Sequence, residues 1–178
     1  MAGIQIPNNL IRREVLVTAP VKPFLNHAIT FYRPTEGWFN QTLRGEVVAG
    51  VVDPLESSGV NSASSFDFLS RTASLLVRKI PVLADLAFIR QWAGMYDVTP
   101  DHLPLIGESK QVWGFHQANG WSGRGMLLSP FSMELLAEGI LDGVLPHALP
   151  KEFDPNRFDG SESAEETVQD YYQRYIEK

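Results

Sequence analysis

The sequence contains no cysteine, no long hydrophobic run and no excess of positive charge. The lack of cysteine excludes disulfide bonds, zinc sites built on thiolates and thiol catalysis. A membrane-spanning helix is excluded because no stretch of about 18 apolar residues occurs. The chain carries 15 lysine and arginine residues against 21 aspartate and glutamate residues, which gives a formal net charge of −6. This acidic balance argues against a protein that binds the phosphate backbone of nucleic acids.

The length of 178 residues predicts one domain, with room for a small appendage. Hydrophobic residues make up 44% of the chain and aromatic residues 11%, which is enough apolar material for a packed core. Residues 1–7 contain neither a basic segment nor an apolar one, so no secretory signal is visible. We therefore expect a cytoplasmic protein.

The first third of the chain has the pattern of an antiparallel sheet. Four segments rich in β-branched and aromatic residues are separated by short turns, at residues 11–18, 27–33, 38–43 and 46–52. The last two are expected to form a hairpin around Arg44 and Gly45, because glycine tolerates the positive φ of a tight turn. Short connections favour antiparallel pairing, since parallel neighbours need long crossovers.

Residues 61–80 change to a helical period. Their apolar residues recur at steps of three and four, at Phe66, Leu69, Ala73, Leu76 and Ile80. Asn61 or Ser62 is placed to cap the start of this helix, and Pro81 is placed to stop it.

The second half predicts two more strands, at residues 85–96 and 112–118, and a helix near residues 126–141. The apolar face of that helix is expected at Leu128, Phe131, Leu135 and Leu141, with Met133 close by. Residues 164–176 form a third, amphipathic helical pattern, with a capping box at Ser163 and Glu166. A mainly antiparallel sheet with a few segregated helices predicts an α+β fold.

The strongest local signal for a binding site is a strand followed by a glycine-rich loop and a helix. The loop comprises Gly120, Trp121, Ser122, Gly123, Arg124 and Gly125. Glycines let the backbone approach a planar or anionic group, and the helix that follows points unsatisfied N–H groups and a partial positive charge at it. A tight structural turn accounts for the same glycines, so both readings stay open at this point.

A dinucleotide-binding fingerprint is absent. The loop has the order G-x-x-G-x-G, which reverses the G-x-G-x-x-G spacing, and that spacing occurs nowhere else in the chain. After the helix come Pro146 and Pro150 instead of a second strand ending in an acidic residue. A dinucleotide bound here would have its phosphates held mainly by something outside this polypeptide.

The ordered motifs carry a family resemblance. They are RQWAGMYDVTPDHLPLIG at residues 90–107, Gly114, the loop from Gly120 to Met126, Ser129-Pro130, QTLRGEVV at residues 41–48 and FDPNRF at residues 153–158. Together they resemble the C-terminal half of the D-amino-acid-oxidase-like FAD family. This family includes glycine oxidase, β-type subunits of sarcosine oxidase and dye-linked proline and amino-acid dehydrogenases. The resemblance covers roughly residues 10–158.

The resemblance implies a sheet that roofs a flavin and a loop and helix that meet its pyrimidine edge. Gly120, Trp121, Ser122, Gly123, Arg124, Gly125, Met126 and Leu127 would contact the ring, chiefly through backbone N–H groups near O2 and N1. The implied chemistry is oxidation of a C–H bond next to an amine by hydride transfer to the flavin. Reduction places negative charge at N1 and O2, which a helix N-terminus favours.

Three departures from the family are informative. The N-terminal Rossmann unit is missing, so the resemblance covers about half an enzyme. Tyr96 stands where glycine oxidase presents an arginine for the substrate carboxylate, and one hydroxyl cannot replace a bidentate charged pair. Leu127 stands where sarcosine oxidases place an oxygen-activating lysine, which favours a dehydrogenase that passes electrons to a carrier.

Single residues outside the loop glycines are further candidates for the site. Tyr96 and Arg124 are the candidate substrate-binding residues, although a half-buried sheet tyrosine and a solvent or interface arginine are the alternatives. Trp92 and His116 are expected in the core, and His102 is expected to be exposed in a turn. No histidine grouping has metal-ligand spacing, and no catalytic residue is identified. Asp97 and Asp101 are interpreted as turn formers.

These observations predict part of an FAD-dependent dehydrogenase, either a subunit or a fragment, that oxidises the C–N bond of an amino acid or secondary amine of the proline, sarcosine or glycine class. Residues 1–158 would form the substrate and flavin-roof domain, and residues 159–178 an amphipathic tail helix that docks on its own domain or on a partner. FAD would be shared with a partner carrying the GxGxxG unit, in a hetero-oligomer. Met1, just before the first strand, favours a separate subunit. The alternatives are a non-catalytic assembly subunit that kept the fold, and an unrelated α+β domain.

Overall fold

The computed structural model describes residues 2–144, 146 and 148–158. These residues form two compact units. We call the unit containing residues 12–95 the sheet unit, and the unit containing the described residues among 2–11 and 96–158 the loop-helix unit. The two longest strands, β1 (Asn9–Thr18) and β5 (Phe88–Val98), supply residues to both units.

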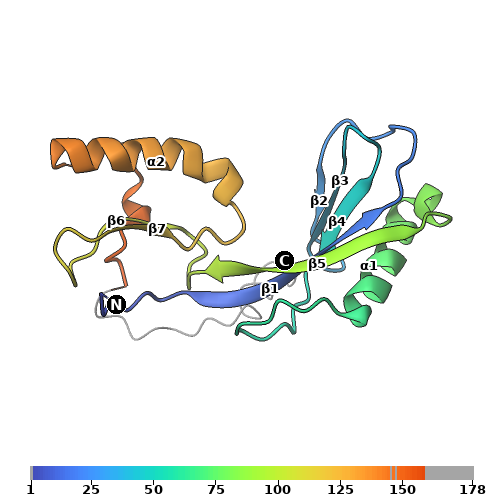
Figure 1. Ribbon diagram of the computed structural model, residues 1–178, viewed down its shortest axis with the longest axis horizontal. Helices are drawn as coiled ribbons and strands as arrows, with labels where there is room; N and C mark the ends of the chain where they lie inside the picture. Colours follow the sequence, from blue (N-terminus) through green and yellow to red (C-terminus); the bar gives the residue numbers. More distant parts are fainter. Residues whose placement is uncertain (1, 145, 147, 159–178) are drawn as a thin grey trace. The chain divides into compact units, whose positions relative to one another are not determined.

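The sheet unit is built on a five-stranded sheet, as Figure 1 shows at the labels β1 to β5. Its other strands are β2 (Ile29–Phe31), β3 (Gly37–Gln41) and β4 (Val47–Val51), and the spatial order is β2-β3-β4-β1-β5. The pairs β2/β3, β3/β4 and β4/β1 are antiparallel. The predicted antiparallel sheet is confirmed, with β1 lying beside β4.

The hairpin between β3 and β4 is also confirmed. The Thr42 N–H donates to the Glu46 carbonyl at 2.9 Å, and Gly45 adopts φ +102° at the turn. A Cβ at Gly45 would overlap the Val21 carbonyl, so the position requires glycine for space as well as for its dihedral angle.

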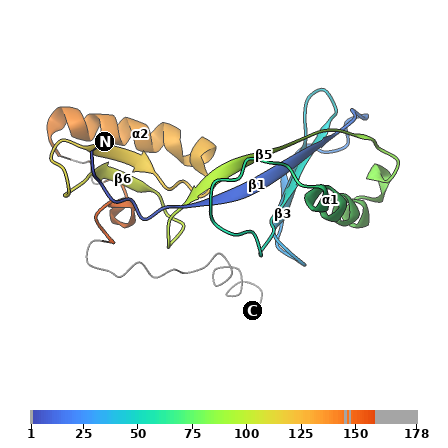
Figure 2. The same ribbon diagram turned by 60° about the horizontal axis from the view of Figure 1, so that its bottom comes forward.

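Helix α1 (Phe66–Lys79) packs on the sheet and completes its core, as Figure 2 shows. A short 3₁₀ helix, η1 (Pro81–Leu83), follows it, so Pro81 stands directly after the helix, as expected. The core cluster joins residues from β1, β3, β4, α1 and η1: Leu16, Phe39, Val47, Ala49, Phe68, Leu76 and Leu83.

The predicted start and buried face of this helix need correction. Ser65 is the N-cap, and its Oγ accepts a hydrogen bond from the Phe68 N–H, in place of the expected Asn61 or Ser62. The N–H and hydroxyl of Ser65 both donate to the buried Glu14 carboxylate of β1. This long-range partner selects the cap, and no local pattern reveals it.

The buried face of α1 is shifted by about one position from the predicted apolar period. The buried residues of α1 are Phe68, Thr72, Leu75 and Leu76. Leu76 was predicted correctly, and Leu69 and Ile80 are partly buried against the core, but Phe66 is 79% exposed. The buried face of α1 contains Thr72, which a search for apolar residues alone does not select.

Strand β5 also differs from the prediction. It runs from Phe88 to Val98 rather than over residues 85–96, and Trp92 is 40% exposed rather than in the core. The Arg90 guanidinium lies 5.4 Å from the centre of the Trp92 ring, which is a cation–π contact on the strand surface. On the opposite face, the Gln91 amide donates to Glu14 and to the Ser65 carbonyl.

Ser65→Ala is expected to destabilise the sheet unit by about 1 kcal/mol or more, since it removes an N-cap and leaves Glu14 with fewer donors. Ser62→Ala changes an exposed serine nearby and serves as the control. Chemical denaturation monitored by circular dichroism measures both. Equal loss in the two variants would show that Ser65 is not the functioning cap.

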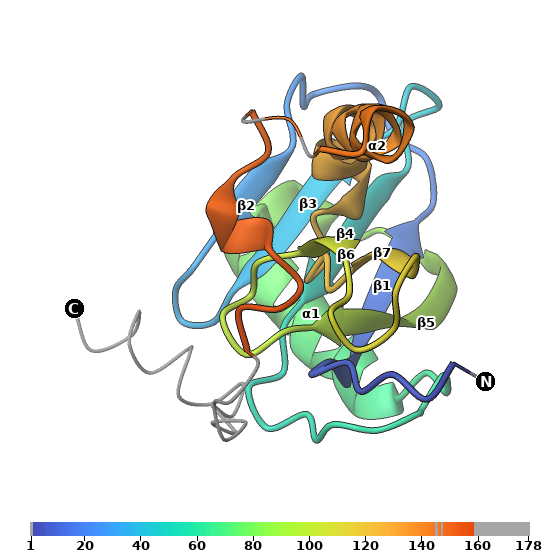
Figure 3. The same cartoon turned by 90° about the vertical axis from the view of Figure 1, so that its left-hand side faces the viewer.

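The loop-helix unit contains a two-stranded sheet and a long helix, which Figure 3 views from the side. Strands β6 (Leu105–Glu108) and β7 (His116–Asn119) pair antiparallel, and α2 (Gly125–Asp142) packs on β6. A 3₁₀ helix, η2 (Lys151–Phe153), also contacts β6. The buried cluster is Ile106, Leu135, Leu136 and Leu149.

Sequence reasoning missed β6 and misplaced β7. Residues 112–115 precede the strand that was predicted at 112–118, and His116 is half-buried at its start rather than in the core. His102 is half-buried with φ +59°, rather than exposed. Strands of four residues are too short to show a clear alternation, which explains both errors.

The predicted limits of α2 are confirmed, and so is the burial of Leu135 on its predicted face, with Met133 partly buried against the same cluster. Gly143 follows it with φ +72°, and Pro130 lies in its second turn, as expected. Its buried residues are Ser132, Leu135, Leu136 and Gly139, whereas Phe131 and Leu141 are 60% and 84% exposed. The helix is apolar around most of its circumference, so periodicity does not single out one face.

The predicted tail helix at residues 164–176, with Ser163 and Glu166, lies outside the described residues. The expected boundary between residues 158 and 159 therefore stays a prediction. In the part of the chain that the structure describes, no helix has the length and apolar character that crossing a membrane requires.

Candidate functional site

The glycine loop connects β7 to α2 in the loop-helix unit. The order of strand, loop and helix predicted from the sequence is confirmed. Three loop residues adopt positive φ, at Gly120 (+71°), Ser122 (+50°) and Gly123 (+84°). Ser122 is the unusual member, since only a few per cent of residues other than glycine adopt this conformation.

Asp97, at the end of β5, holds the loop at two points. Its carboxylate accepts the Gly120 N–H, and its backbone carbonyl accepts the Ser122 N–H at 3.0 Å. A Cβ at Gly120 would overlap the Thr99 methyl group, so the loop also lies tightly against the residues after β5. Interpreting Asp97 only as a turn former missed this contact, because the two partners are 23 residues apart.

Tyr96 lies against the centre of the same loop. It is half-buried, and a Cβ at Gly123 would overlap its ring. The ring therefore occupies the space that the missing Gly123 side chain leaves. Two of the predicted residues, Tyr96 and Gly123, are brought into contact.

Arg124 turns back toward the loop that follows β5. Its guanidinium donates to the His102 carbonyl, and its backbone forms the N-cap position of α2. The guanidinium has five N–H donors, so this bond uses only part of its capacity. The structure thus gives Arg124 a structural partner and leaves a role toward substrate as a prediction.

Arg157 fixes the loop that presents the His102 carbonyl. Its Nε and one terminal nitrogen contact the two oxygens of Asp101 at 2.8 and 2.9 Å. The carbonyls of Leu103 and Pro104 accept further bonds from the same guanidinium at 2.8 and 3.1 Å. Asp101 is therefore one half of a bidentate ion pair, as well as a turn former.

The first turn of α2 leaves donors available. The Leu127 and Leu128 N–H groups both donate to the Arg124 carbonyl, so the N–H groups of Gly125 and Met126 come before any acceptor within the helix. No side chain caps this end, and its first turn holds no acidic residue. The side chains of Met126 and Leu127 are 96% and 78% exposed. This terminus can accept an anionic group.

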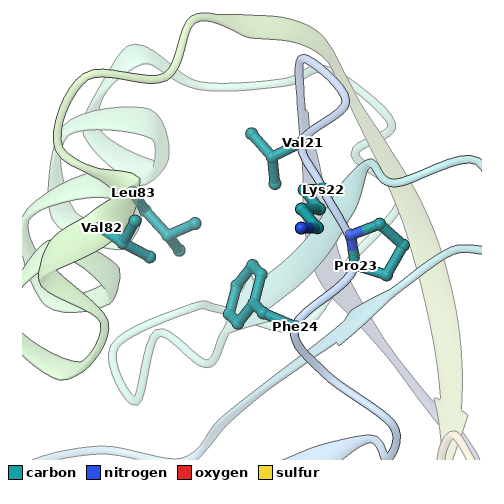
Figure 4. Close-up of a pocket in the computed structure, with 6 residues that line it drawn as sticks. All are labelled: Val21, Lys22, Pro23, Phe24, Val82 and Leu83. Atoms are coloured by element: carbon teal, nitrogen blue, oxygen red, sulfur yellow. The ribbon is translucent and has the colours of Figure 1, made fainter.

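Other features of the described residues do not join this site. An apolar pocket of about 300 Å³ lies in the sheet unit, between residues 21–24 and η1 (Figure 4). It contains none of the predicted site residues. No cluster of three His, Asp or Glu side chains able to hold a metal is found among the residues described.

Comparison with known proteins identifies the family of this chain. The family model for FAD-dependent oxidoreductases (DAO) matches residues 1–139. The chain belongs to this family. It is 29% identical over 171 residues to sarcosine oxidase subunit beta of Rhodobacter capsulatus, an alignment that covers 94% of this chain and 39% of the relative. It is 28% identical over 144 residues to hydrogen cyanide synthase subunit HcnC of Pseudomonas protegens, covering 81% and 33%.

The solved structures agree. L-proline dehydrogenase from P. horikoshii superposes with a TM-score of 0.81 at 27% identity, over 88% of this chain and 41% of that chain. Glycine oxidase from Geobacillus kaustophilus superposes with a TM-score of 0.74 at 18% identity, over 87% and 40%, which shows the shared fold. The predicted resemblance and the α+β class are confirmed. This chain spans between 33% and 41% of the length of these relatives.

The pKa of Asp101 gives a test of the Arg157 anchor. Burial of the carboxyl favours its neutral form, but hydrogen bonds from Arg157 and the Leu103 N–H outweigh this and hold the pKa below its ordinary value. The ionised group therefore stabilises the fold above the unfolded-state pKa of about 4, and this contribution disappears as pH falls through the folded-state pKa.

We expect Asp101→Asn to lower the melting temperature at pH 7 and to differ progressively less from the parent protein below about pH 4. Asp85→Asn changes an exposed aspartate and is the control. Thermal unfolding across this pH range measures the difference. A constant difference at every pH would contradict the assignment.

Asp97→Ala is expected to raise amide hydrogen exchange at Gly120 about tenfold or more, because the amide loses its carboxylate acceptor. Asp97→Asn keeps an acceptor oxygen and should restore most of the protection. Asp142→Ala, at an exposed position late in α2, is the control. Unchanged exchange in Asp97→Ala would show that the carboxylate does not hold the loop.

Proposed function

We propose that this chain is part of an FAD-dependent dehydrogenase that oxidises the C–N bond of a small amino acid or secondary amine. The observation that carries the proposal is the uncapped N-terminus of α2, held behind a glycine loop in a chain of the FAD-dependent oxidoreductase family. Sarcosine, glycine and proline are the substrate classes that the names of its relatives suggest.

The residues fit an isoalloxazine at one edge. Gly125 and Met126 offer backbone N–H groups without intrahelical acceptors, and the first turn contains no acidic side chain to oppose an anion. A Cβ at Gly125 would meet nothing closer than 3.5 Å, so backbone and space are both available there. When bound, the flavin would accept a hydride from the carbon next to the substrate nitrogen.

The proposed roles of the chain are binding and orientation. The N–H groups of residues 120–127 would hold the pyrimidine edge of the flavin, with Asp97 keeping the loop in position. The partial positive charge of the helix N-terminus would favour negative charge at that edge. Tyr96 and Arg124 would contact the substrate carboxylate by hydrogen bonds, and Arg124 has donors beyond the one that His102 accepts.

The chain offers no G-x-G-x-x-G loop for the FAD phosphates. We therefore assign that task to a chain or domain that carries a strand–GxGxxG–helix unit, and we call it the phosphate-binding partner. Two relatives have names that describe subunits, which supports an assembly of this chain with other chains. A cytoplasmic location is part of the same proposal.

The proposal is tested by measuring flavin binding with and without the partner. The purified chain alone should be colourless after desalting, since one edge of the flavin is a small part of the FAD surface. Co-expression with the phosphate-binding partner should yield a yellow complex that reduces an artificial dye with sarcosine, glycine or L-proline. A chain that is stoichiometrically yellow by itself would refute the shared cofactor.

Leu127 predicts the electron acceptor. An apolar side chain at the first turn supplies no cation to stabilise reduced oxygen species, so the complex should reduce dye faster than oxygen. Leu127→Lys should raise oxygen consumption relative to dye reduction, and Phe131→Lys, one turn further along α2, is the matched control. Faster reduction of oxygen than of dye by the unmodified complex would contradict the assignment as a dehydrogenase.

One observation favours a second candidate, a non-catalytic assembly subunit that kept the fold. Both predicted substrate contacts have structural neighbours, because Tyr96 fills the space at Gly123 and Arg124 holds the His102 carbonyl. A yellow complex that oxidises none of the three substrates or D-amino acids would favour this function over the first.

A further inference from the structure

The sheet unit contains an apolar cavity that the proposed function does not use. Figure 4 shows its lining residues, which come from the segment after β1 and from η1. They are Val21, Lys22, Pro23, Phe24, Val82 and Leu83. Five of these six side chains are apolar, and the volume of the cavity is about 300 Å³. This volume lies at the lower end of the range for small-molecule sites in proteins.

One wall of the cavity is held in place by the side chain of Gln41, the last residue of β3. Its Oε1 accepts hydrogen bonds from the Phe24 and Leu25 N–H groups at 2.8 and 3.1 Å. Its Nε2 donates to the Val21 carbonyl at 3.2 Å. The backbone of this wall is therefore fixed by a strand of the sheet, and a ligand does not need to order it on binding.

The opposite wall is η1, which is joined to the core of the sheet unit. Leu83 is 4% exposed and belongs to the core cluster. Val82 and Phe24 are 69% and 43% exposed, so part of their apolar surface stays in contact with water. Figure 4 shows Val82 and Leu83 on one side of the cavity and Phe24 on the other. An apolar group between these walls would remove that surface from water, which is favourable.

Lys22 is the one charged residue among the lining residues, and it is exposed. The part of the chain that the structure describes supplies no carboxylate within ion-pair distance of its ammonium group. A lysine can lay its apolar stem along an apolar surface and keep its ammonium group in water. An apolar cavity with a single cation at its edge suits a ligand with an apolar body and one anionic end.

We propose that this cavity binds a small carboxylate with an apolar chain. The carboxylate would lie at the Lys22 ammonium group, and the chain would lie between Phe24 and Leu83. A water molecule takes up about 30 Å³ in the liquid and a methylene group a similar volume, so the cavity accommodates about ten groups of this size. Octanoate is a ligand of about this size. None of the residues proposed to contact the flavin lines the cavity, so this binding is separate from the proposed function.

A series of straight-chain carboxylates from butanoate to dodecanoate tests the apolar part of the site. Each is titrated into the full chain below its micelle-forming concentration, and methyl NMR reports both the affinity and the site. Octanoate should saturate one site with a Kd of about 1 mM or lower and shift the methyl signals of Val21, Val82 and Leu83. Each added methylene should strengthen binding about fourfold until about eight to ten carbons fill the cavity, and longer chains should gain little.

Two pairs of variants test the contacts. Val82→Glu places a charge in the cavity and should weaken octanoate binding about tenfold or more. Val60→Glu, at a position that is 85% exposed and does not line the cavity, is the matched control. Lys22→Gln should weaken octanoate binding about threefold and leave octanol binding unchanged, since an exposed ion pair contributes modestly. Lys151→Gln, at an exposed position in η2, should change neither. Circular dichroism confirms that the variants fold.

Three results would overturn the assignment. The first is the absence of saturable octanoate binding up to about 10 mM, a concentration at which even a weak ligand of this size is detected. The second is an affinity that is independent of chain length or of Val82→Glu. The third is an equal effect of Lys22→Gln on octanoate and octanol, or no effect on either, because the ammonium group then does not select a carboxylate. If the phosphate-binding partner shifts the same methyl signals and octanoate does not, the cavity receives an apolar side chain of a protein, and the small-ligand site is wrong.

Discussion

The glycine loop before α2 depends on Asp97. One carboxylate and one carbonyl of the same residue accept the N–H groups of Gly120 and Ser122, which are two of the three loop residues with positive φ. Such a turn costs free energy for Ser122, and the pair of hydrogen bonds offsets it. This anchor sets the direction of the first turn of α2. It therefore also sets the direction in which the N–H groups of Gly125 and Met126 point.

A second set of contacts supports the same region. Arg157, near the end of the described chain, binds Asp101 and the carbonyls of Leu103 and Pro104, and the loop that contains these residues presents the His102 carbonyl to Arg124. The Asn8 amide also donates to Asn119, the last residue of β7, at 3.0 Å. Segments far apart in the sequence thus converge on the residues around the glycine loop. This convergence distinguishes a held loop from an ordinary connection.

In the sheet unit, a buried carboxylate has the corresponding role. Glu14 of β1 accepts hydrogen bonds from Ser65 at the start of α1 and from Gln91 of β5. A buried carboxyl group requires several hydrogen-bond donors, and here three donors come from two segments, the start of α1 and β5. The register of β1 and β5 and the starting point of α1 are therefore linked through one side chain. None of these residues was prominent in the sequence, because an isolated glutamate, serine or glutamine is unremarkable without its partners.

The sequence alone determined the α+β class, the hairpin at Gly45, the limits of α2 and the order of strand, glycine loop and helix. These features depend on neighbouring residues: β-branched runs, a turn glycine and a helix end at Gly143. Family membership also came from ordered local motifs. Only the tertiary structure decided that Ser65 is the cap, that Trp92 is exposed, that Asp97 holds the loop and that α2 buries Ser132 and Gly139 while Phe131 and Leu141 are exposed. Each of these depends on a partner tens of residues away or on which side of an element is covered, and a linear pattern contains neither.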